Sequence, residues 1–550
     1  MDGELRQLVH TLHFATDEAK PPDWQPDWEH APLPFKLYGE FTAAFPLSAE
    51  VPLRLPPDKP PNLQPESGAL HNPPDFKTFG HFLWYAYGFT QVSRYAVADG
   101  QALGSGAASA PMFHRAVPSG GGLYPCEIYA YLKLPELPAG IYHYDAAHHR
   151  LLLLREGTFD DYLDRALGER IRTEEAFAVL FVTVCFLKNF WKYSLFSYRL
   201  QGLDAGVLLG QIGEAAVRFG FKPLLFGQFL DRALNHLLGL TEGEESVYAV
   251  MPLGACQPAA LPFSGSLTQT NRLPALYTAA QLIREIPALT LRYSFGNGSA
   301  GSASPHPLLL RMHQASMQEG TDEFRSDPGE DDGEAEAYPV IPLPDVSGAE
   351  TDLAALTRRR YTPETDFTFR PVALIRLSRM LRRAASPGGF CDLDPAPDLP
   401  RVSRNRLICG TFSGVEGLKP GAYRYDAASH SLVLVRPGDH RDWLQYGMLM
   451  DNVNLRQAPM CFHIAGDRRH GINRWGARGY RLQQMEAGLR TQFLLLAAAA
   501  EGWGGRPLLS YDAEAVDDLY RLPPAGVTAL MQIPAGPYRH RARWTNRLHC

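Results

Sequence analysis

Two related passages stand about half a chain apart in this sequence of 550 residues. Residues 137–155 read LPAGIYHYDAAHHRLLLLR and residues 418–436 read LKPGAYRYDAASHSLVLVR, with 11 of 19 aligned positions identical. A second pair follows in the same order, because WKYSLFSYRLQGLDAG (191–206) matches RWGARGYRLQQMEAG (474–488). Two matches in one order and at nearly one spacing predict two tandem copies of one domain. We expect the copies to pair within the chain as an intramolecular pseudo-dimer, so that the protein is otherwise monomeric.

Length and composition agree with two domains. A chain of this length exceeds one hydrophobic core, and division into units of about 200 to 250 residues is the expectation. Apolar residues make up 45% and aromatic residues 11%, enough for two sizeable cores. The net charge of -6 and the absence of a Lys/Arg stripe argue against a nucleic-acid partner.

Cysteine usage and the chain start indicate a cytoplasmic protein. The 7 cysteines are scattered, with no C-x-x-C pair and no His/Cys spacing suited to zinc, so we expect no metal site. An odd number of unclustered thiols suits a reducing compartment. The start, MDGELRQLVHTLHF, does not read as a secretory signal, and no stretch approaches the roughly 18 apolar residues of a membrane span.

Composition shifts divide the chain into four segments. Residues 1–75 are Pro-rich and Trp-dotted, which predicts an extended arm that is neither helix nor sheet. Residues 76–294 form the first domain. Residues 295–350 are Gly/Ser-rich and then acidic, which predicts a flexible linker. Residues 351–550 form the second domain.

Apolar periodicity predicts mixed helices and strands, an α+β class, in both domains. In the first, FGHFLWYAYGF and DAGVLLGQIGEAAVRFGF are predicted helices, whereas IYAYLKL and AVLFVTVCFL are predicted buried strands. In the second, IRLSRMLRRA and EAGLRTQFLLLAAAAEGWG are predicted helices, and GAYRYDAASHSLVLVR is a predicted hairpin.

The first candidate site is the loop PSGGGLYP, which begins with Pro118, Ser119, Gly120, Gly121 and Gly122. Consecutive glycines leave backbone N–H groups unshielded, so a flat or anionic ligand can approach the main chain. The alternative is a tight turn whose glycines only supply positive φ angles.

The second candidate is the adjacent pair Lys192 and Tyr193. This pair could transfer protons if burial lowers the lysine pKa. The alternative is a solvated lysine beside a core tyrosine. The second copy has Arg474 and Trp475 here, and an arginine does not release its proton in a protein.

The two copies have kept complementary features. The second copy has no PSGGGLYP ahead of its hairpin, where it reads VSRNRLICGTFSGVEG. It does begin with Arg358, Arg359 and Arg360, a cluster that suits a phosphate and has no equivalent ahead of FGHFLWYAYGF. Each half therefore lacks what the other retains.

Taken together, these motifs resemble a known family. PSGGGLYP, the Lys-Tyr pair ahead of Tyr198-Arg199, the GxYxYD hairpin and the early TxHxATxxxxPPDW are similar to the SagB/ThcOx-type dehydrogenases of the nitroreductase superfamily. These are FMN enzymes that oxidise thiazolines and oxazolines of ribosomally made peptides to thiazoles and oxazoles. The resemblance implies two tandem nitroreductase-like domains with FMN between them.

The resemblance also implies roles for individual residues. Lys192 and Tyr193 match the catalytic pair, and residues 118–122 would face the isoalloxazine ring. Arg358, Arg359 and Arg360, helped by Arg539 or Arg541, would hold the FMN phosphate. Two motifs depart from the family, because the helix motif ExGH is Asp204-Ala205-Gly206-Val207 here and the serine of the arginine motif is missing.

The predicted function is therefore FMN-dependent dehydrogenation of an azoline in a peptide, with a cyclodehydratase-type enzyme as a possible partner. Two alternatives stay open: a reductase that uses NAD(P)H on nitro or quinone compounds, and a non-catalytic FMN-binding scaffold of a peptide-modifying complex. The fold by itself does not decide in which direction electrons travel, nor whether the substrate is a peptide or a small molecule.

Overall fold

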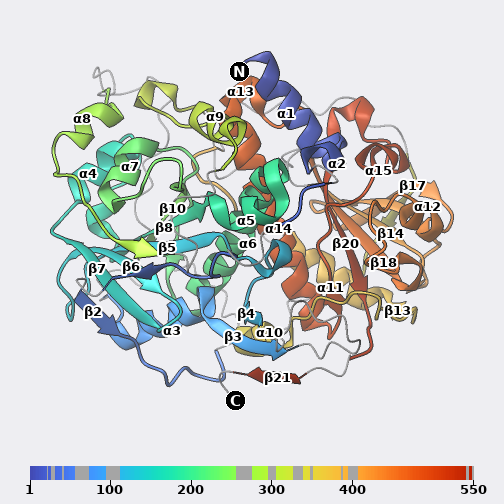
Figure 1. The fold of residues 1–550 in the computed structure, drawn as a ribbon. Coiled ribbons are helices and arrows are strands. Elements are labelled where there is room, and N and C mark those ends of the chain that lie inside the picture. The colour runs from blue at the N-terminus through green and yellow to red at the C-terminus, as the bar shows by residue number, and fades with distance from the viewer. Residues whose placement is uncertain are drawn as a thin grey trace, which may run out of the picture.

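The computed structural model describes residues 1–20, 23–26, 31–39, 43–55, 73–94, 112–254, 276–294, 305–325, 338–346, 351–385, 388–393, 407–540 and 544–547. Two large sheets lie on opposite sides of the molecule, with long helices between them (Figure 1). Among these residues no helix combines the length and hydrophobicity needed to cross a membrane.

The first sheet has seven strands in the order β2-β7-β6-β5-β8-β10-β9, all antiparallel to their neighbours. The strands are β2 (Ala43–Pro46), β7 (Arg150–Glu156), β6 (Gly140–Asp145), β5 (Cys126–Leu132), β8 (Ala178–Cys185), β10 (Glu245–Gly254) and β9 (Lys222–Pro223).

The second sheet repeats this plan, in the order β12-β17-β16-β14-β18-β20-β19 and again fully antiparallel. Each strand occupies the place of its counterpart in the first sheet, so the prediction of two copies of one α+β domain is confirmed. The strands are β12 (Val340–Pro342), β17 (Ser431–Pro437), β16 (Gly421–Asp426), β14 (Leu407–Phe412), β18 (Met460–Asp467), β20 (Val527–Gly536) and β19 (Gly504–Gly505).

Three smaller sheets complete the strands. β1 (Leu37–Tyr38) pairs with β11 (Tyr293–Ser294), and β13 (Val372–Ala373) pairs with β15 (Val415–Glu416). A third sheet places β3 (Phe89–Arg94) between β4 (Met112–Arg115) and β21 (Trp544–Arg547). The last part of the chain thus adds a strand beside the first domain.

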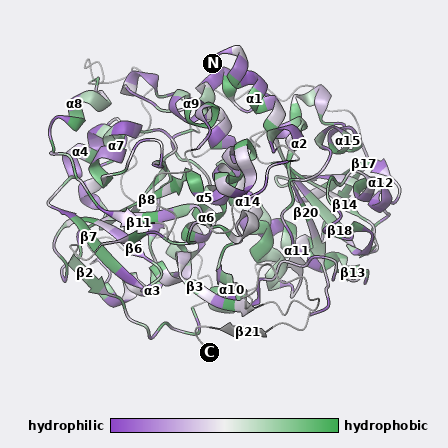
Figure 2. Cartoon of the chain, in the orientation of Figure 1, coloured by the Kyte–Doolittle hydropathy of each residue, from purple (hydrophilic) through white to green (hydrophobic). Residues whose placement is uncertain are grey.

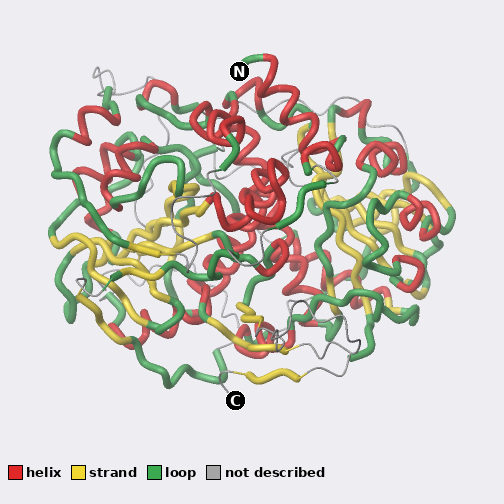
Figure 3. The backbone as a smooth tube through the Cα atoms, in the orientation of Figure 1, coloured by secondary structure: helices red, strands yellow, loops and turns green. Residues whose placement is uncertain are grey.

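The helices also follow the repeat (Figure 3). In the first domain α3 (Phe76–Tyr87) packs on α6 (Ser197–Arg218), and in the second α11 (Leu374–Ala384) packs on α14 (Ala477–Ala500). All four were predicted from the sequence. Two short helices, α5 (Phe186–Tyr193) and α13 (Ile472–Trp475), precede the long ones. The remaining helices are α1 (Gly3–Phe14), α2 (Thr16–Ala19), α4 (Asp160–Ala166), α7 (Asp231–Leu238), α8 (Ala279–Ile283), α9 (Pro307–Ala315), α10 (Leu353–Arg359), α12 (Arg441–Tyr446) and α15 (Ala513–Leu519).

Parts of the predicted arm and linker are regular structure. The prediction of neither helix nor sheet before residue 76 is wrong for α1 and β2, because α1 buries one apolar side and β2 forms the edge of the first sheet. His13 of α1 lies 3.0 Å from the Thr528 hydroxyl, so α1 docks on the second domain. Within the predicted linker, α9 packs on α14 and β12 forms the edge of the second sheet. Residues 295–304, 326–337 and 347–350 lie outside the described residues.

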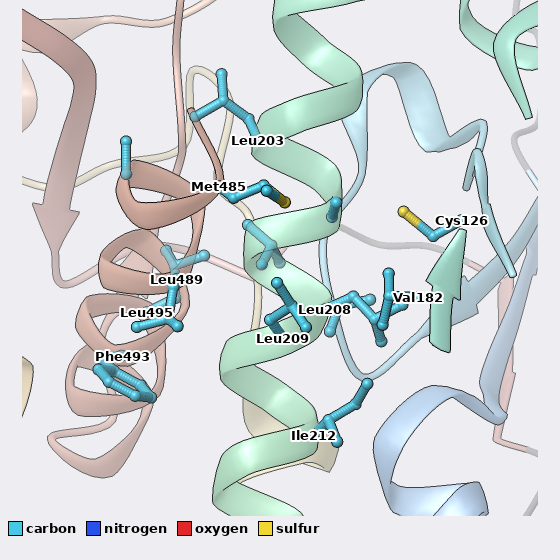
Figure 4. Close-up of a cluster of buried hydrophobic side chains, with 14 of the residues drawn as sticks. Cys126, Val182, Leu203, Leu208, Leu209, Ile212, Met485, Leu489, Phe493 and Leu495 are labelled. Carbon is cyan, nitrogen blue, oxygen red and sulfur yellow. The ribbon is translucent and has the colours of Figure 1, made fainter. Parts of the chain in front are cut away.

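The two domains meet where α6 crosses α14. Figure 4 shows α6 between α14, which contributes Met485 and Leu489, and the strands that carry Cys126 and Val182. A Cβ on Gly206 would stand 1.9 Å from the Met485 carbonyl oxygen, and one on Gly488 would stand 2.1 Å from the Leu203 carbonyl oxygen. The two glycines therefore let the backbones touch.

Burial explains the composition of these two helices. All residues of α14 from Ala477 to Ala499 are buried, because the helix has the other long helix on one side and its own domain on the others. Hydrophilic residues gather instead on outer elements such as α12 (Figure 2).

We predict that Gly206→Ala destabilises the protein by about 1 to 3 kcal/mol, because the added methyl group forces the two backbones apart. Gly213 lies on the same helix, and a Cβ added there would meet no atom within 4 Å, so Gly213→Ala should instead stabilise by up to about 1 kcal/mol. Urea unfolding of both variants measures the difference. Equal stability of the two variants would contradict the close crossing.

Candidate active site

The glycine loop lies between β4 and β5 and is held from one side by α6. Gly121 and Gly122 adopt φ angles of 65° and 71°, so the loop needs the conformational freedom of glycine. Ser119 donates its hydroxyl to Asp204 Oδ2 over 2.8 Å and accepts the Tyr124 N–H over 2.9 Å. The Gly120 N–H donates to Asp204 Oδ1 over 3.1 Å. One carboxylate thus fixes the start of the loop.

Lys192 and Tyr193, at the end of α5, lie against this loop. A Cβ on Gly121 would stand 2.5 Å from Tyr193 Oη and 3.2 Å from Lys192 Nζ. The glycine loop and the Lys-Tyr pair, which were predicted from separate parts of the sequence, are therefore neighbours. A positive φ angle in a tight turn is not the only reason for a glycine at residue 121, because a side chain there would also collide with Tyr193.

The environment shifts the pKa values of the pair in opposite directions. Burial, and after it the Lys20 ammonium, lowers the pKa of Lys192. Burial, and after it the Asp204 carboxylate, raises the pKa of Tyr193 to about 12, although Arg506 opposes this. Near neutral pH Tyr193 keeps its proton, whereas Lys192 releases its proton more readily than an ordinary lysine does.

The backbone directly after the pair is unusual. Ser194 has φ 50° and ψ −139°, a conformation that side chains other than glycine rarely adopt. Gly476, directly after Trp475, has φ 57° and ψ −143°. The two copies share this turn, which supports the alignment of Lys192-Tyr193 with Arg474-Trp475. In the first copy a serine accepts the strain directly beside the candidate catalytic pair.

Asp204 is a site residue that no catalytic motif in the sequence predicted. Burial raises the pKa of Asp204 to about 6, and hydrogen bonds from Ser119, Gly120 and Asn189 oppose this rise. The sequence did contain a signal, because Asp204 stands where the family helix motif has its glutamate. Its role became visible only when α6 and the glycine loop were seen side by side.

The second domain reaches this site through Arg360 and Arg506. Arg360 donates to the Ala116 carbonyl oxygen over 2.9 Å and to the Arg115 carbonyl oxygen over 3.4 Å, directly ahead of Pro118. Arg506 follows β19 and is close enough to influence the Tyr193 phenol. Arg506 was not predicted from the sequence, because a single arginine after a short strand carries no motif.

The other predicted phosphate ligands do not all converge. Arg358 donates to the Leu53 carbonyl oxygen over 2.8 Å, away from the loop, and Arg359 is exposed. Arg539 is exposed and close in sequence to Tyr538, whose ring stacks on Tyr361 at 4.6 Å beside Arg360. Arg541 lies outside the described residues.

Comparison with known proteins shows the family. The model of the nitroreductase family matches residues 71–255 and 413–536, which together make up more than half of the chain. The chain belongs to the nitroreductase family. No curated protein matches the sequence.

A solved structure shows the same fold. A nitroreductase-type protein from Anabaena variabilis is 22% identical with a TM-score of 0.70, over 98% of this chain and 100% of its own. A second from Ralstonia eutropha is 20% identical with a TM-score of 0.30, over 37% of this chain and 90% of its own. The first shows that the complete two-domain architecture is shared.

In this nitroreductase-family chain the repeat implies a second position equivalent to the candidate site. Side chains of the protein itself fill this second position. Gly227 lies there against Leu482, the counterpart of the Leu200 that lies beside Gly120. The Asp392 carboxylate accepts the N–H groups of Gly227 and Gln228 over 2.9 and 2.8 Å, and Arg170 over 3.1 Å. Phe390 packs on Gly227 beside it.

The corresponding backbone at the first position is available. Phe226 pairs with Val250 and Leu508 pairs with Gln532 at matching places in the two sheets, so Leu509 and Ser510 correspond to Gly227 and Gln228. Within the described ranges no hydrogen bond to the N–H groups of Leu509 and Ser510 is found. The N–H groups of Leu509 and Ser510 at the first position are therefore available as donors. At the second position the equivalent N–H groups donate to Asp392.

We predict that Asp204→Asn changes how stability depends on pH. Because the pKa of Asp204 is raised in the folded state, its ionisation destabilises the protein as pH rises from about 4 to about 6. The asparagine variant should therefore gain on the order of 2 to 3 kcal/mol relative to the parent between pH 4 and 7. Urea unfolding across this range measures the gain.

Asp75 provides a control of opposite sign. It caps α3 through the Thr78 N–H, and its hydrogen bonds lower its pKa, so Asp75→Asn should lose stability relative to the parent as pH rises. Parallel pH profiles for the parent and Asp204→Asn would show that Asp204 titrates like an exposed carboxyl group.

Proposed function

We propose that this chain is an FMN-dependent dehydrogenase that oxidises an azoline ring in a ribosomally synthesised peptide. The observation that carries the proposal is the contact of Gly121 with both Lys192 and Tyr193. This contact supports the proposal because, in the roles proposed for them, the two side chains would move protons beside a loop that receives a flat ring.

The residues at the site fit an aromatic cofactor that bears a phosphate. Residues 120–122 have no side chains of their own, and the N–H groups of Leu509 and Ser510 offer donors from the other domain. Among the described residues, the second-domain cations that reach the loop or Tyr193 are Arg360 and Arg506. We assign the phosphate to Arg360, with Arg359, Arg539 and Arg541 as further ligands, because Arg360 lies at the start of the glycine loop whereas Arg358 is directed to Leu53.

Oxidation of an azoline to an azole removes one hydride and one proton. When bound, FMN would supply the two-electron acceptor for the hydride. Lys192 is the better proton acceptor of the pair because its pKa is lowered, whereas the raised pKa of Tyr193 keeps its hydroxyl group protonated. Tyr193 then orients the ring or donates a hydrogen bond to it. A peptide substrate implies a partner enzyme, such as a cyclodehydratase, that forms the azoline.

The same scaffold could run electrons in the other direction. A reductase that takes hydride from NAD(P)H and passes it to a nitro or quinone compound is the second candidate, and the family itself favours it. The third candidate, a non-catalytic scaffold, leaves the lowered pKa of Lys192 without a use. Steady-state assays with NAD(P)H and with an azoline peptide separate the three.

We predict that Lys192→Ala and Tyr193→Phe each lose about 10²- to 10⁴-fold in substrate oxidation while they keep flavin and thermal stability. Arg474→Ala is the matched control, because it alters the equivalent turn of the other copy, and its turnover should stay within a few-fold of the parent. The measurement is kcat together with the absorption spectrum of each purified variant. Normal turnover of Lys192→Ala, or inactivity that comes only from lost flavin, would refute the role.

We predict about one FMN per chain, because Phe390 and Asp392 fill the second position. Absorbance of the released flavin against protein concentration gives the ratio, and a reproducible ratio near two would rule out the single site.

Arg360→Ala should weaken FMN binding by about tenfold or more. Arg358→Ala, which removes only the bond to Leu53 in this scheme, should bind FMN like the parent.

A further inference from the structure

The N-terminal segment brings a second lysine to the candidate active site. Lys20 follows α2, whose last residue Ala19 is fully buried. Beyond it, Trp24 donates its indole N–H to the Trp191 carbonyl oxygen over 3.3 Å and packs edge-on against Phe190 at 5.4 Å. The segment is therefore attached on both sides of Lys20, and one of its anchors is the residue directly before Lys192.

Lys20 and Lys192 face the same aromatic ring. The Lys192 Nζ atom lies 5.5 Å from the centre of the Tyr193 ring, and the Lys20 Nζ atom lies 6.0 Å from it. Two ammonium groups near one ring repel each other, and partial burial weakens the screening by water. A nearby like charge disfavours protonation of an amine, so the Lys20 ammonium favours proton release from Lys192.

Within the part of the chain that the structure describes, the charged and titratable groups that act on Tyr193 beside the pair come from α6 and from the residue after β19, and Tyr193 itself lies on α5. Tyr193 lies on α5 itself, Asp204 lies on α6, and Arg506 follows β19 in the second domain. Asp204 is shared by the Ser119 hydroxyl, the Gly120 N–H and Asn189. Lys20 is the charged side chain that acts on Lys192 after burial itself.

We propose that Lys20 is a positioning residue for the reaction, whose charge beside the same aromatic ring makes Lys192 a readier proton acceptor. The inference deepens the proposed function, because it assumes that Lys192 accepts the substrate proton. It also assigns a role to the N-terminal segment, which forms part of the site although it precedes the domain core in the sequence.

The test compares Lys20→Met and Lys20→Arg in the full-length protein as purified. Trace acetylation with acetic anhydride across pH, read by peptide mass spectrometry, reports the titration midpoint of Lys192 without any turnover. In Lys20→Met the midpoint should rise by about half a unit to one unit, so acetylation below the midpoint slows by about three- to tenfold. Lys20→Arg keeps the charge and should titrate like the parent.

Lys77→Met, which removes an exposed lysine paired with Glu50 at 3.8 Å, is the control for a general change of charge. An unchanged midpoint in Lys20→Met, in a variant that melts like the parent, would overturn the inference. The acid limb of the kcat/KM profile should shift with the midpoint. If the Lys192 midpoint shifts but the acid limb of the kcat/KM profile does not, the effect of Lys20 on Lys192 is supported. The same result contradicts the proposed role of Lys192 as the proton acceptor.

Discussion

The direct contact of α6 with α14 is the interaction on which the rest of the structure depends. At Gly206 and Gly488 the backbones of the two helices touch, which sets the distance between the two sheets. Arg360 and Arg506 reach the first domain's loop and Tyr193 only at that distance. A larger residue at either glycine would therefore disturb the candidate site as well as the stability of the protein.

Buried ion pairs to α14 also hold the two domains together. The Asp231 carboxylate of the first domain is fully buried and accepts Arg478 and Arg481 of α14 over 2.6 and 2.9 Å. Removing the Asp231 carboxylate would leave two buried arginines without their counter-charge, which is strongly destabilising. The two copies are therefore tied by charge pairing in addition to packing, and neither domain buries its central helix without the other.

The two copies have kept their backbone while their chemistry diverged. The turn after Tyr193 and the turn after Trp475 have nearly the same dihedral angles, yet only the first follows a lysine and a tyrosine. Near the candidate site, α5 also supplies Lys188, which pairs with Glu127 over 2.6 Å and donates to the Tyr124 carbonyl oxygen over 3.3 Å. Burial opposes ionisation of Glu127, but Lys188 and His143 outweigh it and lower the pKa of Glu127 to about 2. A fixed ion pair thus supports the helix that presents Lys192.

The sequence by itself determined the repeat, the α+β class, the long helices and the two motifs of the first domain, because these depend on local periodicity and on residue types that occur in both copies. The link between Gly121 and Lys192, which are far apart in the chain, was expected only through the family resemblance, and the fold showed it as a contact. Helix α1 was missed although Asp2 caps it and Leu5, Leu8 and Leu12 recur at helical spacing, because the prolines after residue 20 decided the interpretation of the whole segment. Strand β2 was missed because its pairing with β7 is a long-range contact that no local pattern reports. The direction of Arg358 toward Leu53, the clamp by Asp204 and the approach of Lys20 depend on how distant segments meet. Only the tertiary structure decided these contacts, since the free energy of each comes from groups that the sequence places hundreds of residues apart or on different elements.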